Sequence, residues 1–310
     1  MIITVTLNPA IDKTAELAEF NHGGLNRLMN VIRDAGGKGI NVSKTISALG
    51  GKSIATGFIG GSAGDFIKNS LLEKGIKADF VSVKGETRTN LKVVEGNGFV
   101  TELNEPGPDI TKEEIEELKQ KLIQYASTDT VYVFAGSIPK SVSTDAYREM
   151  IVSVKEKGAK VFLDADGQLF RDVIDTKPDI IKPNRVELEE YFHINYRASE
   201  EELVAMGRKF LEKGVGFVAV SLGQMGALFI TQSEVLRCPG LKVEAHSTVG
   251  AGDAMVAGLT YGIDLGLSLE ECVKLAMATS AGAVTTIGTK APERTLVDTL
   301  QQQVEILPLS

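Results

Sequence analysis

An aspartate inside a glycine-rich turn is the residue whose surroundings point most directly to chemistry. Residues 248–254 read Thr-Val-Gly-Ala-Gly-Asp-Ala, and a helix of small residues is predicted from Ala254 onward. Small residues at a helix N-terminus let backbone N–H groups approach an anion closely, and the helix dipole adds to the attraction. A carboxylate there would repel a phosphate unless it had another task. Asp253 is therefore interpreted as a base for an attacking hydroxyl, although it could simply complement the dipole of a capped helix.

A second glycine-rich turn covers residues 34–41, which read Asp-Ala-Gly-Gly-Lys-Gly-Ile-Asn. Its glycines would open a helix beside a cation, Lys38, and an amide, Asn41, which can bind phosphate or sugar hydroxyls. A strand-to-helix turn with a solvated lysine explains the same pattern. Both interpretations stay open from these residues alone.

Asn184 and Glu187 stand three residues apart where a helix is expected to follow a short strand. One amide and one carboxylate, together with several waters, suit Mg²⁺, a hard ion that takes oxygen ligands. The alternative is an N-cap residue followed by a glutamate in the first helical turn.

Other polar residues fit contacts with a sugar or with phosphate. Arg88 could bind a phosphate, with Asn90 on the same strand face, or could make a cross-strand salt bridge. Asp12 could hold two hydroxyls or cap a turn. Ser221 and Gly223 could offer a hydroxyl and a bare backbone to phosphate, or form a tight turn.

Several common motifs are missing. The sequence has neither a Gly-x4-Gly-Lys-Ser/Thr loop nor a Gly-x-Gly-x-x-Gly fingerprint, and it has no Gly-x-Ser-x-Gly elbow. Its three histidines lack the spacing for a metal site or a catalytic triad. Cys238 and Cys272 are interpreted as buried thiols of a reducing cytoplasm.

Charge and hydropathy narrow the choice of partners. The net charge of −8 argues against binding to nucleic acid or to an anionic membrane surface, because both favour basic proteins. No apolar run approaches the roughly 18 residues that a membrane helix needs, and the N-terminus lacks the features of a signal peptide. A cytoplasmic protein that acts on a small molecule is expected.

Short apolar runs alternate with amphipathic stretches, which predicts βα repeats and a mainly parallel sheet. Strands are expected at residues 2–7, 53–58, 130–135, 160–163, 180–181 and 217–221. Helices are expected at residues 40–49, 65–74, 111–124, 199–212 and 269–285, the second ending at a left-handed Gly75 and the third opening with a capping box. A single domain over residues 1–310 is expected.

Residues 14–33 and 86–105 interrupt this alternation with strand-like patterns and turns, including a Glu-Gly-Asn-Gly hairpin signal. A few antiparallel strands from these two segments are expected to form a small sheet, or lid, over one edge of the main sheet. Its apolar face would need cover from a substrate or a second subunit, so a homodimer through the lid is expected.

Six motifs in this order resemble the ribokinase-like carbohydrate kinases of the PfkB family, over essentially the whole chain. They lie at residues 6–12, 36–41, 57–60, 182–187, 221–223 and 248–253. The resemblance implies an α/β fold, a ribokinase-like three-layer α/β/α sandwich with a small β lid. It also implies ATP and Mg²⁺ as cofactors and transfer of the γ-phosphoryl group to a sugar hydroxyl.

The same resemblance implies a role for each motif residue. The catalytic residues would be Asp253 as the base, with Gly250, Ala251 and Gly252 as an anion hole. ATP would be bound by Lys182, Asn184, Ser221, Gly223, Thr248, Gly250, Gly252 and Gly282, and the metal would be linked to Asn184 and Glu187. The substrate would be held by Asp12, Gly37, Lys38, Asn41, Arg88, Asn90 and Ser137, and by Arg27 from the lid of a neighbouring subunit.

The substrate implied by the resemblance is a small phosphorylated ketohexose. Residues 86–92 and 101–107 look most like those of the members that phosphorylate the 6-hydroxyl of fructose 1-phosphate to give fructose 1,6-bisphosphate. Tagatose 6-phosphate and fructose 6-phosphate are the alternatives within the family. A sugar-phosphate sensor without catalysis is a further alternative, in which Asp253 and Glu187 would be expendable.

Overall fold

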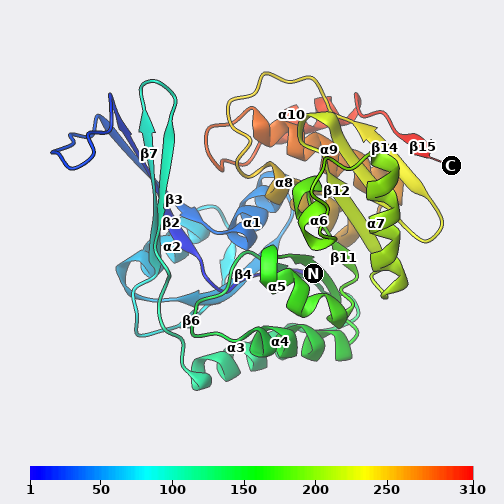
Figure 1. Ribbon diagram of the computed structural model, residues 1–310. Helices are drawn as coiled ribbons and strands as arrows, with labels where there is room; N and C mark the ends of the chain where they lie inside the picture. Colours follow the sequence, from blue (N-terminus) through cyan, green and yellow to red (C-terminus); the bar gives the residue numbers. More distant parts are fainter. Residues whose placement is uncertain (310) are drawn as a thin grey trace.

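A mainly parallel sheet forms the centre of the computed structural model, which describes residues 1–309 (Figure 1). The six predicted strands are its parallel core and start and end at, or next to, the predicted residues. In spatial order they are β12 (Phe217–Ser221), β11 (Ile180–Ile181), β10 (Lys160–Asp164), β9 (Val131–Ala135), β1 (Ile2–Thr6) and β4 (Ser53–Ile59). Strands β1, β4 and β9 are buried along their whole length, because helices cover both faces of a parallel sheet.

Short strands that were not predicted extend both edges. Antiparallel β13 (Gly226–Ile230), β14 (Val235–Pro239) and β15 (Leu307–Leu309) continue the sheet beyond β12. On the other side, β5 (Lys77–Ala78) and β6 (Val81–Ser82) pair with β4. The turn between β13 and β14 reads Thr-Gln-Ser-Glu and so lacks the Asn-Gly or Asp-Gly signal by which hairpins are found.

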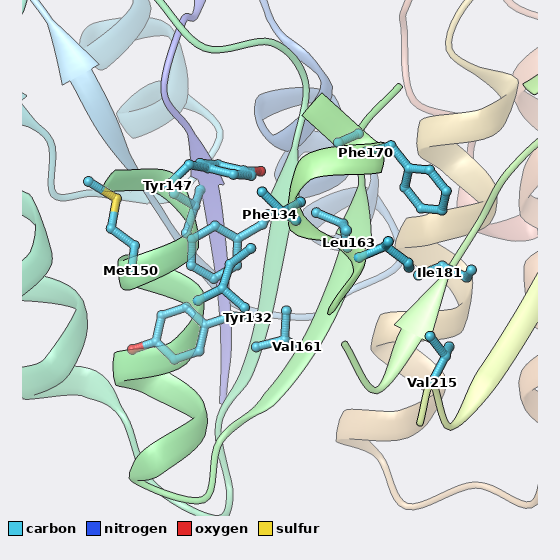
Figure 2. Packing of buried hydrophobic residues seen from close by; sticks show 14 of the residues in the cluster. Tyr132, Phe134, Tyr147, Met150, Val161, Leu163, Phe170, Ile181 and Val215 are labelled. Atoms are coloured by element: carbon cyan, nitrogen blue, oxygen red, sulfur yellow. The ribbon is translucent and has the colours of Figure 1, made fainter. Parts of the chain in front are cut away.

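Helices form the two outer layers, which confirms the predicted three-layer arrangement. One apolar cluster joins the sheet to α3 (Lys112–Tyr125), α4 (Thr144–Glu156), α5 (Gly167–Val173), α6 (Arg185–Tyr191) and α7 (Glu200–Glu212). The other joins it to α1 (Lys38–Ala48), α8 (Ala251–Asp264), α9 (Leu269–Val284) and α10 (Arg294–Gln301). Figure 2 shows part of the first cluster, where the ring of Phe134 meets that of Tyr147 edge to face, 5.6 Å between centroids. Among residues 1–309, no helix is both long and apolar enough to cross a membrane.

The five predicted helices are confirmed, and so are two of their end signals. Thr111 and Glu114 form the capping box of α3, and Gly75 has φ +71°. Helix α2 (Gly61–Glu73) begins earlier than predicted. Its first turn is rich in small residues that favour helices weakly, and Glu86 stabilises it by accepting a hydrogen bond from the N–H of Ala63 at 2.6 Å.

A separate sheet of four strands stands out from the side of this body (Figure 1). Its order is β3 (Asn30–Gly36), β2 (Ala10–Leu17), β7 (Arg88–Glu95) and β8 (Val100–Asn104), and we call it the small sheet. β2 with β3 and β7 with β8 are antiparallel, but the central β2–β7 pair is parallel, so the prediction of antiparallel strands was wrong there. The reason is that both central strands leave the body in the same direction.

Candidate active site

Several of the predicted site residues lie at the carboxyl ends of the parallel strands. Ser137 follows β9, Lys182 and Asn184 follow β11, and Ser221 ends β12. In open α/β sheets this edge is where ligands bind, because loops and helix N-termini meet there. The small sheet begins beside it, since β2 follows directly after β1.

The glycine-rich turn at 248–253 opens helix α8 without a side-chain cap. Gly250 is the N-cap residue and has φ +84°, a conformation that side-chain-bearing residues rarely adopt. The first-turn N–H groups of an α-helix have no partner within the helix, so they are available to an anion. A Cβ at Gly252 would lie 3.2 Å from the Nζ of Lys182, so this glycine leaves room for the ammonium group.

Asp253 lies buried in the first turn of α8, and 8% of the residue is exposed. The Nδ2 of Asn41, in α1, donates a hydrogen bond to its Oδ2 at 2.8 Å. Burial, together with the negative charge of Asp164, raises the pKa of Asp253 to about 6, although Asn41 and nearby lysines oppose the shift. A carboxylate with this pKa is a stronger base than usual and is still about 90% ionised at pH 7.

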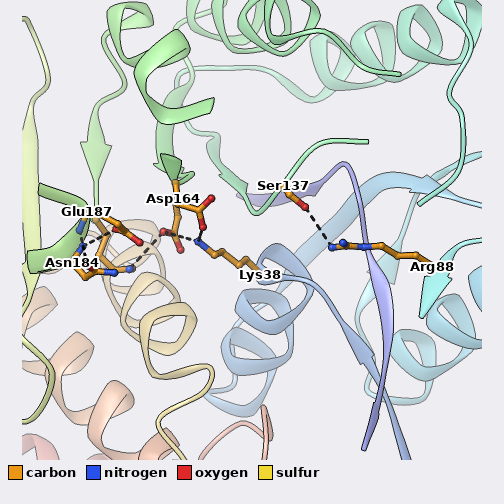
Figure 3. Close-up of polar contacts among 8 residues, drawn as sticks. Lys38, Arg88, Ser137, Asp164, Asn184 and Glu187 are labelled. Atoms are coloured by element: carbon orange, nitrogen blue, oxygen red, sulfur yellow. Dashed lines mark hydrogen bonds and ion pairs between the residues drawn. The ribbon is translucent and has the colours of Figure 1, made fainter. Parts of the chain in front are cut away.

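Asp164, at the end of β10, lies between two ammonium groups (Figure 3). Its Oδ1 is 3.6 Å from the Nζ of Lys38 and 3.6 Å from the Nζ of Lys182, and its side chain is 3% exposed. Burial alone would raise the pKa of Asp164, but the two cations lower it overall. The site therefore holds two positive charges and an ionised carboxylate close to Asp253.

Lys38 points from the N-terminus of α1 toward this carboxylate, as Figure 3 shows. Its Nζ also lies 3.3 Å from the Oδ2 of Asp166, a largely exposed residue at the N-cap position of α5. Burial alone would lower the pKa of Lys38, but the surrounding carboxylates, first Asp164 and then Asp166, raise it. Lys38 is therefore a permanent cation.

Asn184 and Glu187 form a capping box at the start of α6, so the alternative interpretation of this pair is confirmed. The N–H of Glu187 donates to the Oδ1 of Asn184 at 2.9 Å, and the N–H of Asn184 donates to the Oε2 of Glu187 at 2.8 Å. The box leaves Oε1 of Glu187 available to a ligand. Burial raises the pKa of Glu187, as expected for a carboxylate that lacks a cation in direct contact.

These oxygen atoms fit Mg²⁺ as the metal of a nucleotide. Residues 1–309 contain no group of three His, Cys, Asp or Glu side chains that could hold a metal by themselves. Mg²⁺ needs no such group, because it keeps several waters and takes one or two carboxylates together with phosphate oxygens. The free oxygen of Glu187 suits that role.

A second set of polar residues lies where the small sheet meets the body. Asn90 donates through Nδ2 to the Oδ1 of Asp12 at 3.2 Å, and the pKa of Asp12 is raised, chiefly by burial. Arg88 donates through Nε to the backbone oxygen of Asn8 at 3.2 Å and through Nη2 to the Oγ of Ser137 at 3.4 Å (Figure 3). The parallel pairing of β2 with β7 sets Asp12 directly opposite Asn90.

Buried oxygens without a hydrogen-bond partner mark where a ligand would complete this region. Within the described residues, they include the Oδ1 atoms of Asn41 and Asn90. Buried polar atoms are nearly always paired in folded proteins, so exceptions call for a ligand or an ordered water. The other ends of these two amides bind Asp253 and Asp12, and their free oxygens suit sugar hydroxyls.

Close packing explains the second glycine-rich turn. Gly37 has φ +113°, and a Cβ there would lie 2.8 Å from the Cγ2 of Thr6. A Cβ at Gly36 would collide with the carboxylate of Asp12, and one at Gly39 with the hydroxyl of Thr6. These glycines let the start of α1 approach the end of β1 and the start of β2, which carries Lys38 into the site.

Some predicted site residues are not drawn into this arrangement. Arg27 is exposed in the connection between β2 and β3, and Thr248 is exposed in the turn before α8. Gly282 lies within α9, where a Cβ would come 2.9 Å from the Cβ of Pro292, so helix–loop packing accounts for it. Gly223 has φ +63° and begins a short 3₁₀ helix after Ser221.

Asp164 is the site residue that the sequence interpretation missed. The available signal was its position, since it directly follows a predicted strand whose carboxyl end belongs to the ligand-binding edge. Nothing in its local sequence distinguishes it from a turn residue. Its importance comes from Lys38 and Lys182, which only the fold brings to it.

Comparison with known proteins gives a consistent result. The family model described as pfkB family carbohydrate kinase matches residues 5–296. A 1-phosphofructokinase of Borreliella burgdorferi is 41% identical over 288 residues, covering 93% of this chain and 92% of that protein. A tagatose-6-phosphate kinase of Staphylococcus epidermidis is 35% identical over 282 residues, covering 90% of both. Phosphofructokinase-2 from Escherichia coli superposes with a TM-score of 0.92 at 26% identity, covering 97% of this chain and 98% of that one.

Proposed function

This chain belongs to the pfkB family of carbohydrate kinases, and we propose that it transfers the γ-phosphoryl group of ATP to the 6-hydroxyl of fructose 1-phosphate. The product would be fructose 1,6-bisphosphate. The observation that carries the proposal is the buried Asp253, with its raised pKa, at the uncapped N-terminus of α8. The choice of substrate is supported by the 1-phosphofructokinase that is 41% identical to the chain.

In the proposed reaction, Asp253 accepts the proton of the 6-hydroxyl as its oxygen attacks the γ-phosphorus. The bond between that phosphorus and the β–γ bridging oxygen breaks, and ADP leaves. Backbone N–H groups of Gly250, Ala251 and Gly252 would stabilise the negative charge on the transferring oxygens, which is where preorganised donors help most. Lys182, beside Gly252, would add a cation at the same place.

The nucleotide would lie along the carboxyl ends of β11 and β12. Lys182 and Ser221 would contact its phosphates, and Asn184 with Glu187 would hold Mg²⁺, which neutralises phosphate charge. The backbone at Gly223 and Thr248 would lie along the same edge of the sheet, with the region of Gly282 near the adenine. The capping-box geometry supports Glu187 in this role, because one carboxylate oxygen is fixed and the other is free.

The sugar phosphate would lie between α1 and the small sheet, which would act as a lid and exclude water. Asp12, Asn41 and Ser137 would contact the sugar, and Arg88 and Asn90 its phosphate. Lys38 and the backbone of Gly37 complete the proposed set. A bound phosphate would compete with Asp164 and Asp166 for Lys38, which makes this contact sensitive to those two carboxylates.

We propose further that two copies of the chain associate through their small sheets. Exposed apolar side chains gather on this sheet and its connections, namely Leu25, Leu28, Met29, Val31, Ile32, Phe99, Val100 and Leu103. Burying them in an interface would remove apolar surface from water and so stabilise the dimer. The exposed Arg27 could then reach the site of the other copy. The cytoplasmic location expected from the sequence stays a prediction.

A coupled assay of ADP release with fructose 1-phosphate, fructose 6-phosphate and tagatose 6-phosphate tests the proposed function. We expect kcat/KM to be highest for fructose 1-phosphate. A higher value for tagatose 6-phosphate would shift the assignment to the activity of the 35% identical relative. Binding of all three sugars without ADP release would indicate a sensor and would contradict the proposal.

A further inference from the structure

One carboxylate oxygen joins the small sheet to two distant parts of the body. This atom is the Oδ2 of Asp34, in β3. The Nζ of Lys44, in α1, donates to it at 2.9 Å, and the Oγ1 of Thr289, between α9 and α10, donates to it at 3.4 Å. The small sheet, the substrate-binding helix and the segment after α9 therefore meet at a single atom.

The lysine in this contact is almost completely buried. The side chain of Lys44 is 4% exposed, and its Nζ also donates to the backbone oxygen of Ala35 at 2.8 Å. A buried ammonium that loses its counter-ion leaves an uncompensated charge, so this pair resists separation. The base of the small sheet is thereby fixed to α1, the helix that carries Lys38 and Asn41.

Thr289 contacts the turn that opens α8. A Cβ added to Gly250 would lie 3.4 Å from the Cγ2 of Thr289 and 3.5 Å from its Cα, so the two residues pack directly together. The N–H groups of His246 and Ser247, just before this turn, donate to the backbone oxygen of Val284, the last residue of α9, at 2.9 Å and 3.1 Å. The end of α9 thus supports the approach to this turn, while Thr289, in the segment after α9, lies against Gly250 and also reaches the small sheet.

We infer that Asp34 and Thr289 are positioning residues that couple the binding of sugar phosphate to the binding of nucleotide, an inference that rests on the proposed function. A sugar phosphate held by Asp12 would fix β2, and Asp34 lies directly opposite Asp12 on β3. The hydrogen bond from Thr289 then holds Gly250 in the arrangement that the nucleotide phosphates need. By thermodynamic linkage, each ligand strengthens binding of the other by the same factor.

The coupling factor can be measured by calorimetry. It is the ratio of the dissociation constants of a non-hydrolysable ATP analogue with Mg²⁺, determined without and with saturating fructose 1-phosphate. Thr289→Val removes the hydroxyl but keeps the volume beside Gly250. We expect it to reduce the coupling factor about 3- to 10-fold, the equivalent of one hydrogen bond, and to change binding of fructose 1-phosphate alone very little. Thr289→Ser keeps a hydroxyl and should retain the wild-type factor.

Thr285→Val is the matched control, because the hydroxyl of Thr285 donates to the backbone oxygen of Gly282 and belongs to the same segment. It should leave the coupling factor unchanged. Wild-type coupling in Thr289→Val, an equal loss in Thr285→Val, or no coupling in an active wild-type enzyme would each overturn the inference. A wild-type protein that neither binds nor phosphorylates any sugar phosphate would refute the proposed function, and the inference would fall with it.

Discussion

Replacing Asp164 by asparagine should lower the pKa of Asp253 and move the acid limb of the pH–rate profile. The pKa of Asp253 is raised to about 6, chiefly by burial and secondly by the negative charge of Asp164. Asparagine has nearly the same shape and no charge. The substitution also leaves Lys38 and Lys182 without their shared counter-ion, and both cations favour the ionised form of Asp253. The two consequences therefore act in the same direction.

The size of the shift follows from the electrostatics of a buried site. Two charges about 8–12 Å apart interact by about 1.4–2 kcal/mol at an effective dielectric constant near 20, and about 1.4 kcal/mol corresponds to one pKa unit. We therefore expect the acid limb of kcat to move from near pH 6 in the wild type to about pH 5 in Asp164→Asn.

The assay is the pH dependence of kcat and kcat/KM for the wild type, Asp164→Asn and Asp166→Asn. The substrate phosphate also titrates at a pKa of about 6, but an enzyme substitution does not alter that ionisation, so the difference between profiles reports on the protein. Asp166 is the matched control, because it lies 3.3 Å from Lys38 but its side chain is 60% exposed. Solvent screens such a charge, so the acid limb of the pH–rate profile of Asp166→Asn should move by less than about 0.3 pH units. An acid limb that stays in place or moves up in Asp164→Asn would show that the charge of Asp164 does not raise the pKa of Asp253.

Three other substitutions have defined outcomes. Gly252→Ala should raise the melting temperature or leave it unchanged, since alanine favours helices by about 1 kcal/mol relative to glycine. It should nevertheless lower kcat/KM for ATP about 10-fold or more, because its Cβ would crowd the Nζ of Lys182, 3.2 Å away. Wild-type kinetics in this variant would contradict the prediction. Arg88→Met should lower kcat/KM about 10- to 100-fold for fructose 1-phosphate and much less for fructose, and equal losses for both sugars would oppose a phosphate contact. Asp253→Asn should stabilise the unliganded protein against urea at pH 7 by about 1–3 kcal/mol, because the raised pKa of Asp253 adds stability below about pH 4 that is lost as the pH rises through about 6. For that variant, a stability gain that persists undiminished at pH 4 would refute the assigned cause.

The parallel core of the main sheet could be predicted because each of its six strands is encoded locally. β1 and β9 are short apolar runs between turn residues, and their burial on both faces follows from their composition. The direction of β2 relative to β7 is not local information. Residues 10–17 and 88–95 come together only after the chain has completed β4 and α2, so alternation in each segment predicts a strand but not a parallel pair.

The same distinction applies to the site. Asp253 could be identified because the glycines beside it form a continuous motif, whereas Asp164 acquires its role from Lys38 and Lys182. Asn41, the hydrogen-bond partner of Asp253, lies 212 positions away from it in the sequence, so their hydrogen bond could not be predicted from either motif. For Asn184 and Glu187 the structure confirms the capping box, and the metal interpretation stays a prediction, since the box leaves one carboxylate oxygen for a ligand.

The turnover of Asp253→Asn shows whether Asp253 removes the proton from the acceptor hydroxyl. We predict that kcat falls about 100-fold or more, as expected when a positioned base is lost, while the dissociation constant of fructose 1-phosphate changes by less than about 3-fold. Near-normal kcat with intact binding would exclude Asp253 as the base.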